Sequence, residues 1–320
     1  MINYVLLLLL LLSVDTLAES GKPKVFVGLF GVVARSISYT WPQIDQMIIK
    51  PLEKKGYQPH IVLWNLDVGS TLVDQQVINN ADIKIIPYNA LRSAKQSNID
   101  SVIDQECPKK SCAKWVHTGL SSTNALRQMY AEYSLGKWLA TTMDDYAFSI
   151  VIGPDFYPLI PLELDELNTQ YVYTSVQGDY SGVTNGFLVG SSKHIAKLLM
   201  RYDDFIHSRH IIHEASDSYE IILAKYFQNY AIPRRITNMV FCKMRANKIC
   251  RWPGKGSKSP AVSRLSQEQK SELSRQICKL QKSFWLYTAD IPSGWIDTGL
   301  LLAKEKLKGL YRAASCLLLV

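Results

Sequence analysis

The sequence predicts an α/β fold in which helices cover both faces of an open, mainly parallel, twisted sheet. Short β-branched and aromatic runs alternate along the chain with longer segments of helical periodicity. Repeated strand–helix units of this kind are typical of parallel sheets covered on both faces. The 320 residues are 47% hydrophobic and 20% charged, which allows a large core and excludes a wholly disordered chain.

The first predicted unit is a strand, a loop and a helix. Lys24 to Phe30 is a β-branched and aromatic run that ends at Gly31, and Pro42 is placed to begin a helix that Gly56 ends. The same reasoning predicts further strands at 59–64, 83–86, 148–152, 171–176, 186–189 and 236–242, and helices at 121–142, 191–202 and 218–230. The polar segment 93–114 is expected to form an irregular excursion.

The amino terminus has the pattern of a secretory signal peptide. An apolar run from Val5 to Val14 ends at Asp15, and small residues near Ala18 offer a cleavage site. The run is shorter than the roughly 20 residues that a spanning helix needs, so we expect no stable membrane span. We therefore predict a signal peptide at 1–18 and residence in the ER or Golgi lumen, or secretion.

Two further segments complete the expected domain organisation. Residues 19–250 contain the strand–helix pattern and are predicted to form the main domain. In 251–320 the pattern weakens to a Gly/Pro/Lys/Ser loop and a basic helix at 266–282, and we expect this segment to pack on the same domain.

Six cysteines are expected to pair if the chain enters an oxidising compartment. Cys107 lies close to Cys112, and Cys242 lies close to Cys250, so both pairs suit local disulfides. Cys278 and Cys316 are left as a third pair, although spacing alone does not choose among the pairings.

The positive charge of the chain is concentrated in one segment. From Pro233 to Lys282 there are 13 Lys and Arg against two Asp and Glu, a net charge of +11 within a chain of net +8. A nucleic-acid partner is not expected, because few aromatic side chains accompany this charge and the secretory lumen supplies little nucleic acid.

Several common catalytic signatures are missing from the sequence. It contains no G-x-G-x-x-G after the first strand, no G-x-x-x-x-G-K-[ST], no H-E-x-x-H and no G-x-S-x-G nucleophile elbow. The absence of these motifs argues against a dehydrogenase, a P-loop enzyme or an ordinary lipase.

Polar residues follow the ends of several predicted strands, where open α/β sheets bind ligands. The segments concerned are Gly28–Gly31 with Arg35 after it, Ile152–Asp155 and Thr184–Ser191, together with Ser218–Glu220 at the start of a late predicted helix. In order and spacing they resemble a group of glycosyltransferases found in algae, protists and large viruses, whose nucleotide-sugar domain is GT-A-like. The resemblance covers about Lys24 to Lys248. Gly153 stands where the group commonly has Arg, and Asn185 stands where it commonly has Asp.

The resemblance implies a glycosyltransferase with a nucleotide-sugar donor and a glycan or glycoprotein acceptor. Arg35, Lys243 and Arg245 are candidates to neutralise the donor diphosphate, the alternative being ordinary loop or surface charges. Asp155 is a candidate ligand for Mn or Mg, since hard cations prefer carboxylate oxygens; its alternative is a turn or helix-entry carboxylate. The sequence contains no D-x-D motif.

Two more positions are candidates for the site. Asn185 can hydrogen-bond a sugar hydroxyl or a base, and its alternative is a turn residue before Gly186. Glu220 is the candidate catalytic base for the acceptor hydroxyl, although Asp217 to Glu220 also fits a capping box at a helix start. The second function consistent with these residues is a non-catalytic carbohydrate or nucleotide-sugar binding protein on the same fold.

Overall fold

The computed structural model describes residues 21–107, 120–165, 167–175, 182–207, 218–237, 239–247, 250–251, 266–269 and 271. The predicted signal peptide at 1–18 lies outside the described residues, as does most of the segment 251–320. No helix in these described ranges is long and apolar enough to cross a membrane.

A seven-stranded mixed sheet forms the centre of the molecule, in the order β10-β8-β9-β6-β1-β2-β5. All neighbouring strands are parallel except β9, which runs antiparallel to both β6 and β8. The predicted α/β class with a mainly parallel sheet is therefore confirmed. The strands are β1 (Lys24–Gly31), β2 (Gln58–Asp67), β5 (Ala90–Lys95), β6 (Phe148–Ile152), β8 (Val172–Ser175), β9 (Phe187–Gly190) and β10 (Arg234–Thr237).

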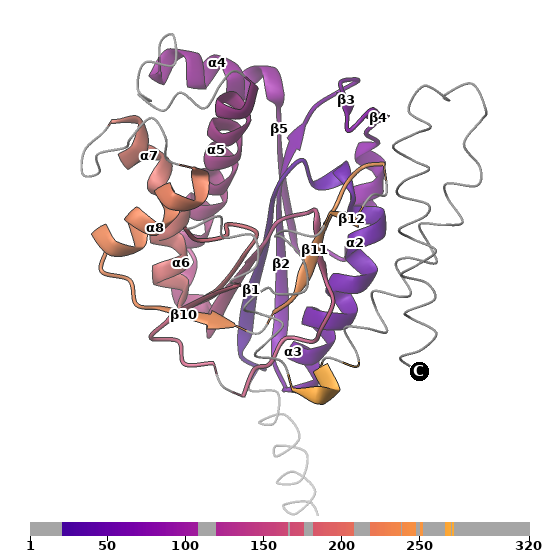
Figure 1. Cartoon of the computed structure of the whole chain (residues 1–320), viewed down its shortest axis with the longest axis vertical. Coiled ribbons are helices and arrows are strands. Elements are labelled where there is room, and N and C mark those ends of the chain that lie inside the picture. The colour runs from indigo at the N-terminus through magenta and orange to yellow at the C-terminus, as the bar shows by residue number, and fades with distance from the viewer. Residues whose placement is uncertain are drawn as a thin grey trace, which may run out of the picture.

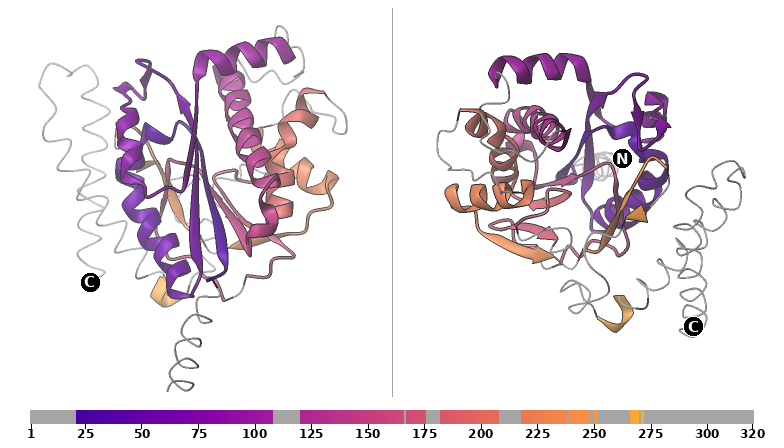
Figure 2. Two further views of the ribbon diagram at one scale, coloured as in Figure 1. Left: turned by 180° about the vertical axis from the view of Figure 1, so that it is seen from behind. Right: turned by 45° about the horizontal axis from the view of Figure 1, so that its top comes forward.

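Helices cover both faces of this sheet (Figures 1 and 2). One face carries α4 (Gln96–Glu106), α5 (Leu120–Ala140), α6 (Ser192–Leu199), α7 (Arg201–Ile206) and α8 (Tyr219–Asn229). The other carries α2 (Ile37–Ile44) and α3 (Lys50–Lys54), which are joined by a π-helical segment, Asp45–Ile49. Short 3-10 helices occupy Val33–Arg35, Asn80–Ile85 and Met143–Asp145.

The alternation of side chains along β1 explains the two cores. Val25, Val27 and Leu29 pack on the α2 side, whereas Phe26 and Phe30 pack on the α5 side, and all are buried. Gly28 allows α5 to approach β1 closely, because a Cβ at this position would lie only 2.8 Å from Leu135 Cδ2. Because side chains on both faces of β1 are buried, its sequence is a nearly continuous apolar run and does not alternate.

Two small sheets complete the fold. A three-stranded sheet has the order β12-β11-β7, and a two-stranded hairpin pairs β3 with β4. The strands are β7 (Phe156–Pro158), β11 (Phe241–Met244), β12 (Cys250–Arg251), β3 (Leu72–Val73) and β4 (Gln76–Val77). The amide of Met244 donates to the Asp155 carbonyl at 2.7 Å, so the three-stranded sheet holds the end of β11 against the end of β6.

The first helix begins before the predicted proline. It starts at Ile37, and Pro42 lies inside it. The Ser36 carbonyl accepts from the Thr40 amide, and the hydroxyls of Ser36 and Thr40 both donate to the Pro154 carbonyl. These tertiary hydrogen bonds anchor the extra turn to the sheet edge. The helical segment continues through α3 to Lys54, and Gly56, the predicted end, lies just beyond it with a φ of +83° that suits glycine.

The predicted strand at 83–86 is wrong, because this segment belongs to the 3-10 helix Asn80–Ile85. The Asn79 side chain accepts from the Ala81 amide at 3.0 Å and caps that helix. Ile83 and Ile86 are buried while Ile85 is 45% exposed. The buried positions are therefore three residues apart, as on a 3-10 helix, and do not alternate as in a half-buried strand.

Two other predicted segments differ from the structure. The expected excursion at 93–114 contains the end of β5 and all of α4, in which Ile99 and Ile103 are buried four residues apart as on a helix face. The expected strand at 236–242 is divided, since β10 joins the main sheet and β11 joins the small one. β10 and β11, which are neighbours in the sequence, thus belong to different sheets.

Two of the six cysteines lie in the described part of the core. Cys107 follows α4 and Cys242 lies in β11, and both are fully buried. Of the predicted partners, Cys112 lies outside the described residues, and Cys250 pairs its backbone with Met244 in the β11–β12 ladder. The two local pairings stay predictions.

The start of the predicted basic helix touches the main domain. Ser266 and Gln269 form a capping box, in which the Ser266 amide donates to Gln269 Oε1 and the Gln269 amide donates to Ser266 Oγ. The Gln269 side-chain amide also donates to Glu163. Residues 267–269 and 271 are thus helical with Ser266 as the cap, and the rest of the predicted helix lies outside the described residues.

Candidate functional site

A cavity of about 710 Å³ opens at the carboxyl ends of β1, β2 and β6. This is the edge at which open α/β sheets bind ligands. Its lining carries four cationic side chains, Arg35, Arg127, Lys243 and Arg245, and two carboxylates, Asp74 and Asp155. The cavity is therefore electropositive, which suits an anionic ligand.

Five of the six predicted site residues meet in this cavity. They are Arg35 after β1, Asp155 after β6, Asn185 before β9, Lys243 in β11 and Arg245 just after it. Residues far apart in sequence are thus brought together because β1 and β6 are parallel neighbours that end at the same edge.

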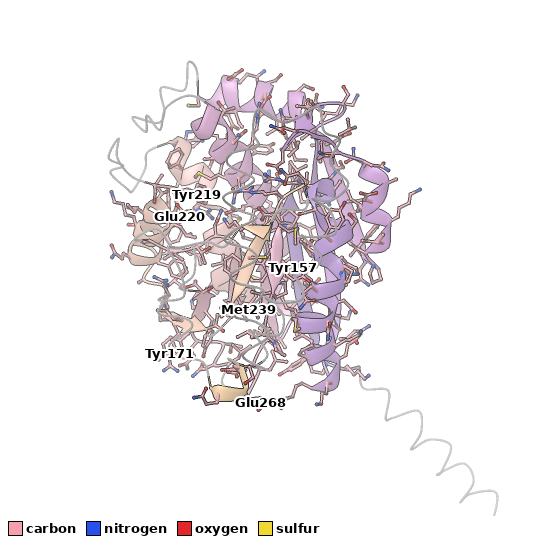
Figure 3. All side chains as sticks on the ribbon, turned by 45° about the vertical axis from the view of Figure 1, so that its right-hand side comes forward. Tyr157, Tyr171, Tyr219, Glu220, Met239 and Glu268 are labelled. Carbon is pink, nitrogen blue, oxygen red and sulfur yellow. The ribbon has the colours of Figure 1, made fainter. Side chains whose placement is uncertain are left out.

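The sixth predicted residue, Glu220, is placed elsewhere. It lies in the first turn of α8 beside Tyr219 (Figure 3), and it is not among the described residues that line the cavity. The N-cap of α8 is Ser218, whose Oγ accepts from the Ile221 amide at 3.2 Å, while Asp217, the expected start of a capping box, lies outside the described residues. The Glu220 carbonyl accepts from the Val183 amide at 2.8 Å.

An ion-pair cluster occupies one side of the cavity. Arg35 donates from Nε and Nη2 to both oxygens of Asp74, at 2.8 and 2.9 Å. Asp155 Oδ2 lies 3.9 Å from Arg35 Nη1 and 3.6 Å from Arg245 Nη1. Asp155 therefore lies between two guanidinium groups and holds them at the cavity wall.

Asp74 was not identified from the sequence. It lies in the β3–β4 turn, and its carboxylate also accepts from the Ala246 amide at 3.2 Å. Burial alone would raise the pKa of Asp74, but the hydrogen bonds and charge of Arg35 lower it below its ordinary value. Arg35 and Asp74 are 39 residues apart in the sequence, so no local pattern predicts their contact.

The same turn has an unusual backbone. Asp74 and Gln75 have φ angles of 51° and 65°, a left-handed conformation that is costly for a side chain such as glutamine. Two positive φ angles are typical of a type I′ turn, in which Asp-Gly is a favoured pair. The ion pair of Asp74 with Arg35 helps to hold this turn over the cavity.

We predict that Gln75→Gly raises the free energy of unfolding by about 0.5–1 kcal/mol, because glycine adopts the left-handed conformation without strain. Gln76→Gly, in the adjacent strand β4, is the matched control and is expected to lower stability. Urea unfolding of both variants measures the effect. A loss of stability in Gln75→Gly would contradict the assigned turn.

A buried polar network lies beneath Asn185. Glu132 of α5 and Arg201 of α7 are each 1% exposed and form an ion pair. Glu132 Oε1 accepts from the Tyr219 hydroxyl at 2.8 Å, from Gln128 Nε2 at 3.2 Å and from Asn185 Nδ2 at 3.5 Å. The network thus connects the helical layer to two residues of the cavity lining.

The electrostatics of this network favour a charged arginine and a neutral tyrosine. Burial alone would lower the pKa of Arg201, but Glu132 raises it above its ordinary value. Burial raises the pKa of Tyr219 well above its ordinary value, and the Glu132 charge adds to this effect although Arg201 opposes it. Tyr219 therefore acts as a hydroxyl donor at ordinary pH.

The sequence contains one signal for this network. Glu132 precedes Leu135 and Leu139 by three and seven residues, which places a carboxylate on the buried stripe of a helix. A charge at such a position requires a buried partner. The identity of that partner, Arg201, comes only from the packing of α7 against α5.

Arg127 lies on the helical side of the cavity and is held firmly. Its Nε and Nη2 donate to the two oxygens of Asp100 at 2.6 and 2.7 Å, and its Nη1 donates to Asn124 at 2.9 Å. Its charge is thus positioned by α4 and by its own helix.

The two cavity carboxylates do not fit a divalent-ion site in this arrangement. Asp74 and Asp155 both contact Arg35, and Arg245 also lies against Asp155. A cation bound to Asp155 would meet two guanidinium groups within 4 Å of the same oxygen. In the described part of the chain, no group of three or more His, Cys, Asp or Glu side chains is arranged to hold a metal.

Comparison with known proteins yields no match at the level of sequence. No family model matches the chain. No curated protein matches it significantly.

Proposed function

We propose that this protein is a glycosyltransferase, which binds a nucleotide sugar in the cavity and transfers the sugar to a hydroxyl of a glycan or glycoprotein. The observation that carries the proposal is the convergence of Arg35 and Arg245, with Lys243 beside them, at the carboxyl edge of the sheet. Guanidinium groups form charge-assisted, often bidentate hydrogen bonds with phosphates.

The fold and the size of the cavity support the same proposal. An open, mainly parallel sheet with helices on both faces is what a GT-A-like domain requires, and the strands β1, β2 and β6 end at the cavity. Ligand pockets commonly measure about 300–1,000 Å³, a range that includes this cavity. The space is adequate for a nucleoside diphosphate with a sugar attached.

The cationic side chains have a direct chemical role in such a transfer. Negative charge grows on the diphosphate as the bond to the sugar breaks. Arginines held in place before the reaction stabilise this charge without reorganisation. Asp155 positions both Arg35 and Arg245, so in this scheme it acts through them.

A second candidate function is non-catalytic binding of a carbohydrate or nucleotide sugar. Both carboxylates of the cavity lining are ion-paired, and Glu220 is not among the described residues that form it. A transferase that activates its acceptor by general base catalysis needs a carboxylate or histidine within reach of the acceptor hydroxyl. Turnover therefore separates the two functions.

The test is a thermal-shift series with UDP, GDP, ADP and their sugar conjugates, in EDTA and in Mn. We expect at least one to stabilise the protein in EDTA, by about 2.7 kcal/mol at a hundredfold excess over Kd. At the same nucleotide concentration, Arg245→Met is expected to reduce the shift because its affinity is weaker, whereas Arg92→Met, an exposed arginine on β5, is expected to retain it.

Two outcomes would count against the proposal. Absence of a shift with every nucleotide, with and without Mn, would overturn it. Binding without release of nucleoside diphosphate from the sugar conjugate, across a panel of glycan and glycoprotein acceptors, would favour the non-catalytic function instead.

A further inference from the structure

We propose that Glu132 is a positioning residue, which turns the amides of Gln128 and Asn185 so that their carbonyl oxygens accept hydrogen bonds from ligand hydroxyls. The inference rests on the proposed function, because it assigns the hydroxyl-bearing part of a nucleotide sugar to one side of the same cavity. It names Gln128 and Asn185 as the residues that determine specificity there.

Glu132 can only accept hydrogen bonds from its neighbours. A carboxylate that is paired with a guanidinium is an acceptor only, so its other neighbours must present donors. Arg201 pairs with one oxygen of Glu132, while Gln128, Tyr219 and Asn185 all donate to the other. Both amides must therefore direct their nitrogens toward Glu132.

The carbonyl oxygen of each amide faces a different environment from its nitrogen. Gln128 and Asn185 both line the cavity, and Asn185 is only 6% exposed. Within the described part of the chain, neither carbonyl oxygen has a hydrogen-bond donor from the protein. With the nitrogens committed to Glu132, these oxygens are the acceptors left for a ligand in the cavity.

The cavity offers both cationic groups and neutral acceptors to a ligand. Arg35, Lys243 and Arg245 line it with cationic groups, while Gln128 and Asn185 are neutral acceptors; Arg127, beside Gln128, already donates to Asp100 and Asn124. A ligand that satisfies both carries an anionic group and hydroxyl donors. The hydroxyls come either from the transferred sugar or from the ribose, and both sources share this chemistry.

The buried ion pair makes the orientation robust. Arg201 is 1% exposed and also donates from Nη1 to the Leu198 carbonyl at 2.7 Å, which holds the guanidinium and hence Glu132 in place. An isolated Gln128 or Asn185 side chain would rotate at little cost. The network removes that freedom before a ligand binds, which is preorganisation of the binding site.

The test uses two variants of the full chain and three probes: pyrophosphate, a nucleoside diphosphate and its sugar conjugate, chosen from those that the parent protein binds. Gln128→Met keeps the side-chain volume and leaves the Glu132–Arg201 pair intact. Glu132→Met with Arg201→Met removes the positioning pair together, so that no buried charge is left alone and the fold is retained.

We expect Gln128→Met to weaken binding of the sugar conjugate roughly tenfold and to leave pyrophosphate binding unchanged. The double variant is expected to show the same selective loss, and adding Gln128→Met to it is expected to have little further effect. A purely structural role would weaken all three probes together. If Gln128→Met weakens binding of both the nucleoside diphosphate and the sugar conjugate, the hydroxyls belong to the ribose. If it weakens binding of the sugar conjugate alone, they belong to the transferred sugar.

Unchanged binding of the sugar conjugate by Gln128→Met would overturn the inference while leaving the proposed function in place. Additive losses in the combined variant would also overturn it, because they would show that Gln128 acts independently of Glu132. Failure of the parent protein to bind any nucleotide would overturn the proposed function and the inference together.

Discussion

Replacement of Arg201 by methionine is expected to lower the free energy of unfolding by about 3–5 kcal/mol. The change leaves the Glu132 carboxylate buried at 1% exposure without its guanidinium partner. The hydrogen bonds from Tyr219 and Gln128 do not replace a full positive charge. Urea denaturation at neutral pH measures the difference.

Two controls separate the loss of the ion pair from loss of packing. Arg92→Met changes an exposed arginine and is expected to alter stability by less than about 0.5 kcal/mol. The double replacement of Glu132 and Arg201 by methionine is expected to be more stable than the single Arg201 variant, because no unpaired charge stays buried. A single variant as stable as the parent would show that the pair is not buried in solution.

Replacement of Arg245 by methionine is expected to lower transferase turnover about a hundredfold to a thousandfold. The reason is that Arg245 lies at the cavity wall where the departing diphosphate would gain charge, and removal of such an electrostatic group costs about this much. The measurement is release of nucleoside diphosphate under saturating donor, with melting temperature recorded on the same samples.

Glu220→Gln is the informative comparison. Glu220 lies in the first turn of α8 and is not among the described residues of the cavity lining. The turnover of the Glu220→Gln variant is therefore expected to stay close to that of the parent protein. If Glu220→Gln abolished turnover while Arg245→Met retained it, the reaction would have to occur beside α8, and the assignment of the cavity would be wrong.

Local sequence patterns carried enough information to predict most of the central elements. The strand at 148–152 has the predicted bounds, and those near 24–31 and 58–67 differ by a few residues, because each is an apolar run buried on both faces. The predicted helix at 121–142 corresponds to α5, Leu120–Ala140, because its apolar residues recur with helical periodicity. The segments predicted wrongly or only in part are 83–86, 93–114 and 236–242.

The candidate site could be predicted in part because strand ends are recognisable. Arg35 and Asp155 follow β1 and β6, and parallel strands end at one edge of a sheet. Asp74 had no such signal, since it reaches Arg35 only through the position of the β3–β4 hairpin. Glu220, at the start of α8, is not among the described residues of the cavity lining, and nothing in its local sequence indicates this.

The sequence by itself determined the α/β class, the main strands and the concentration of cationic residues near strand ends, because these depend on short-range hydrophobic patterns and chain order. Only the tertiary structure decided that β9 runs antiparallel, that β10 and β11 belong to different sheets, and that Glu132 pairs with Arg201. The physical reason is that strand direction and buried ion pairs depend on which distant segments pack together. A short stretch of sequence does not show which distant segments will make those contacts or how much free energy they contribute.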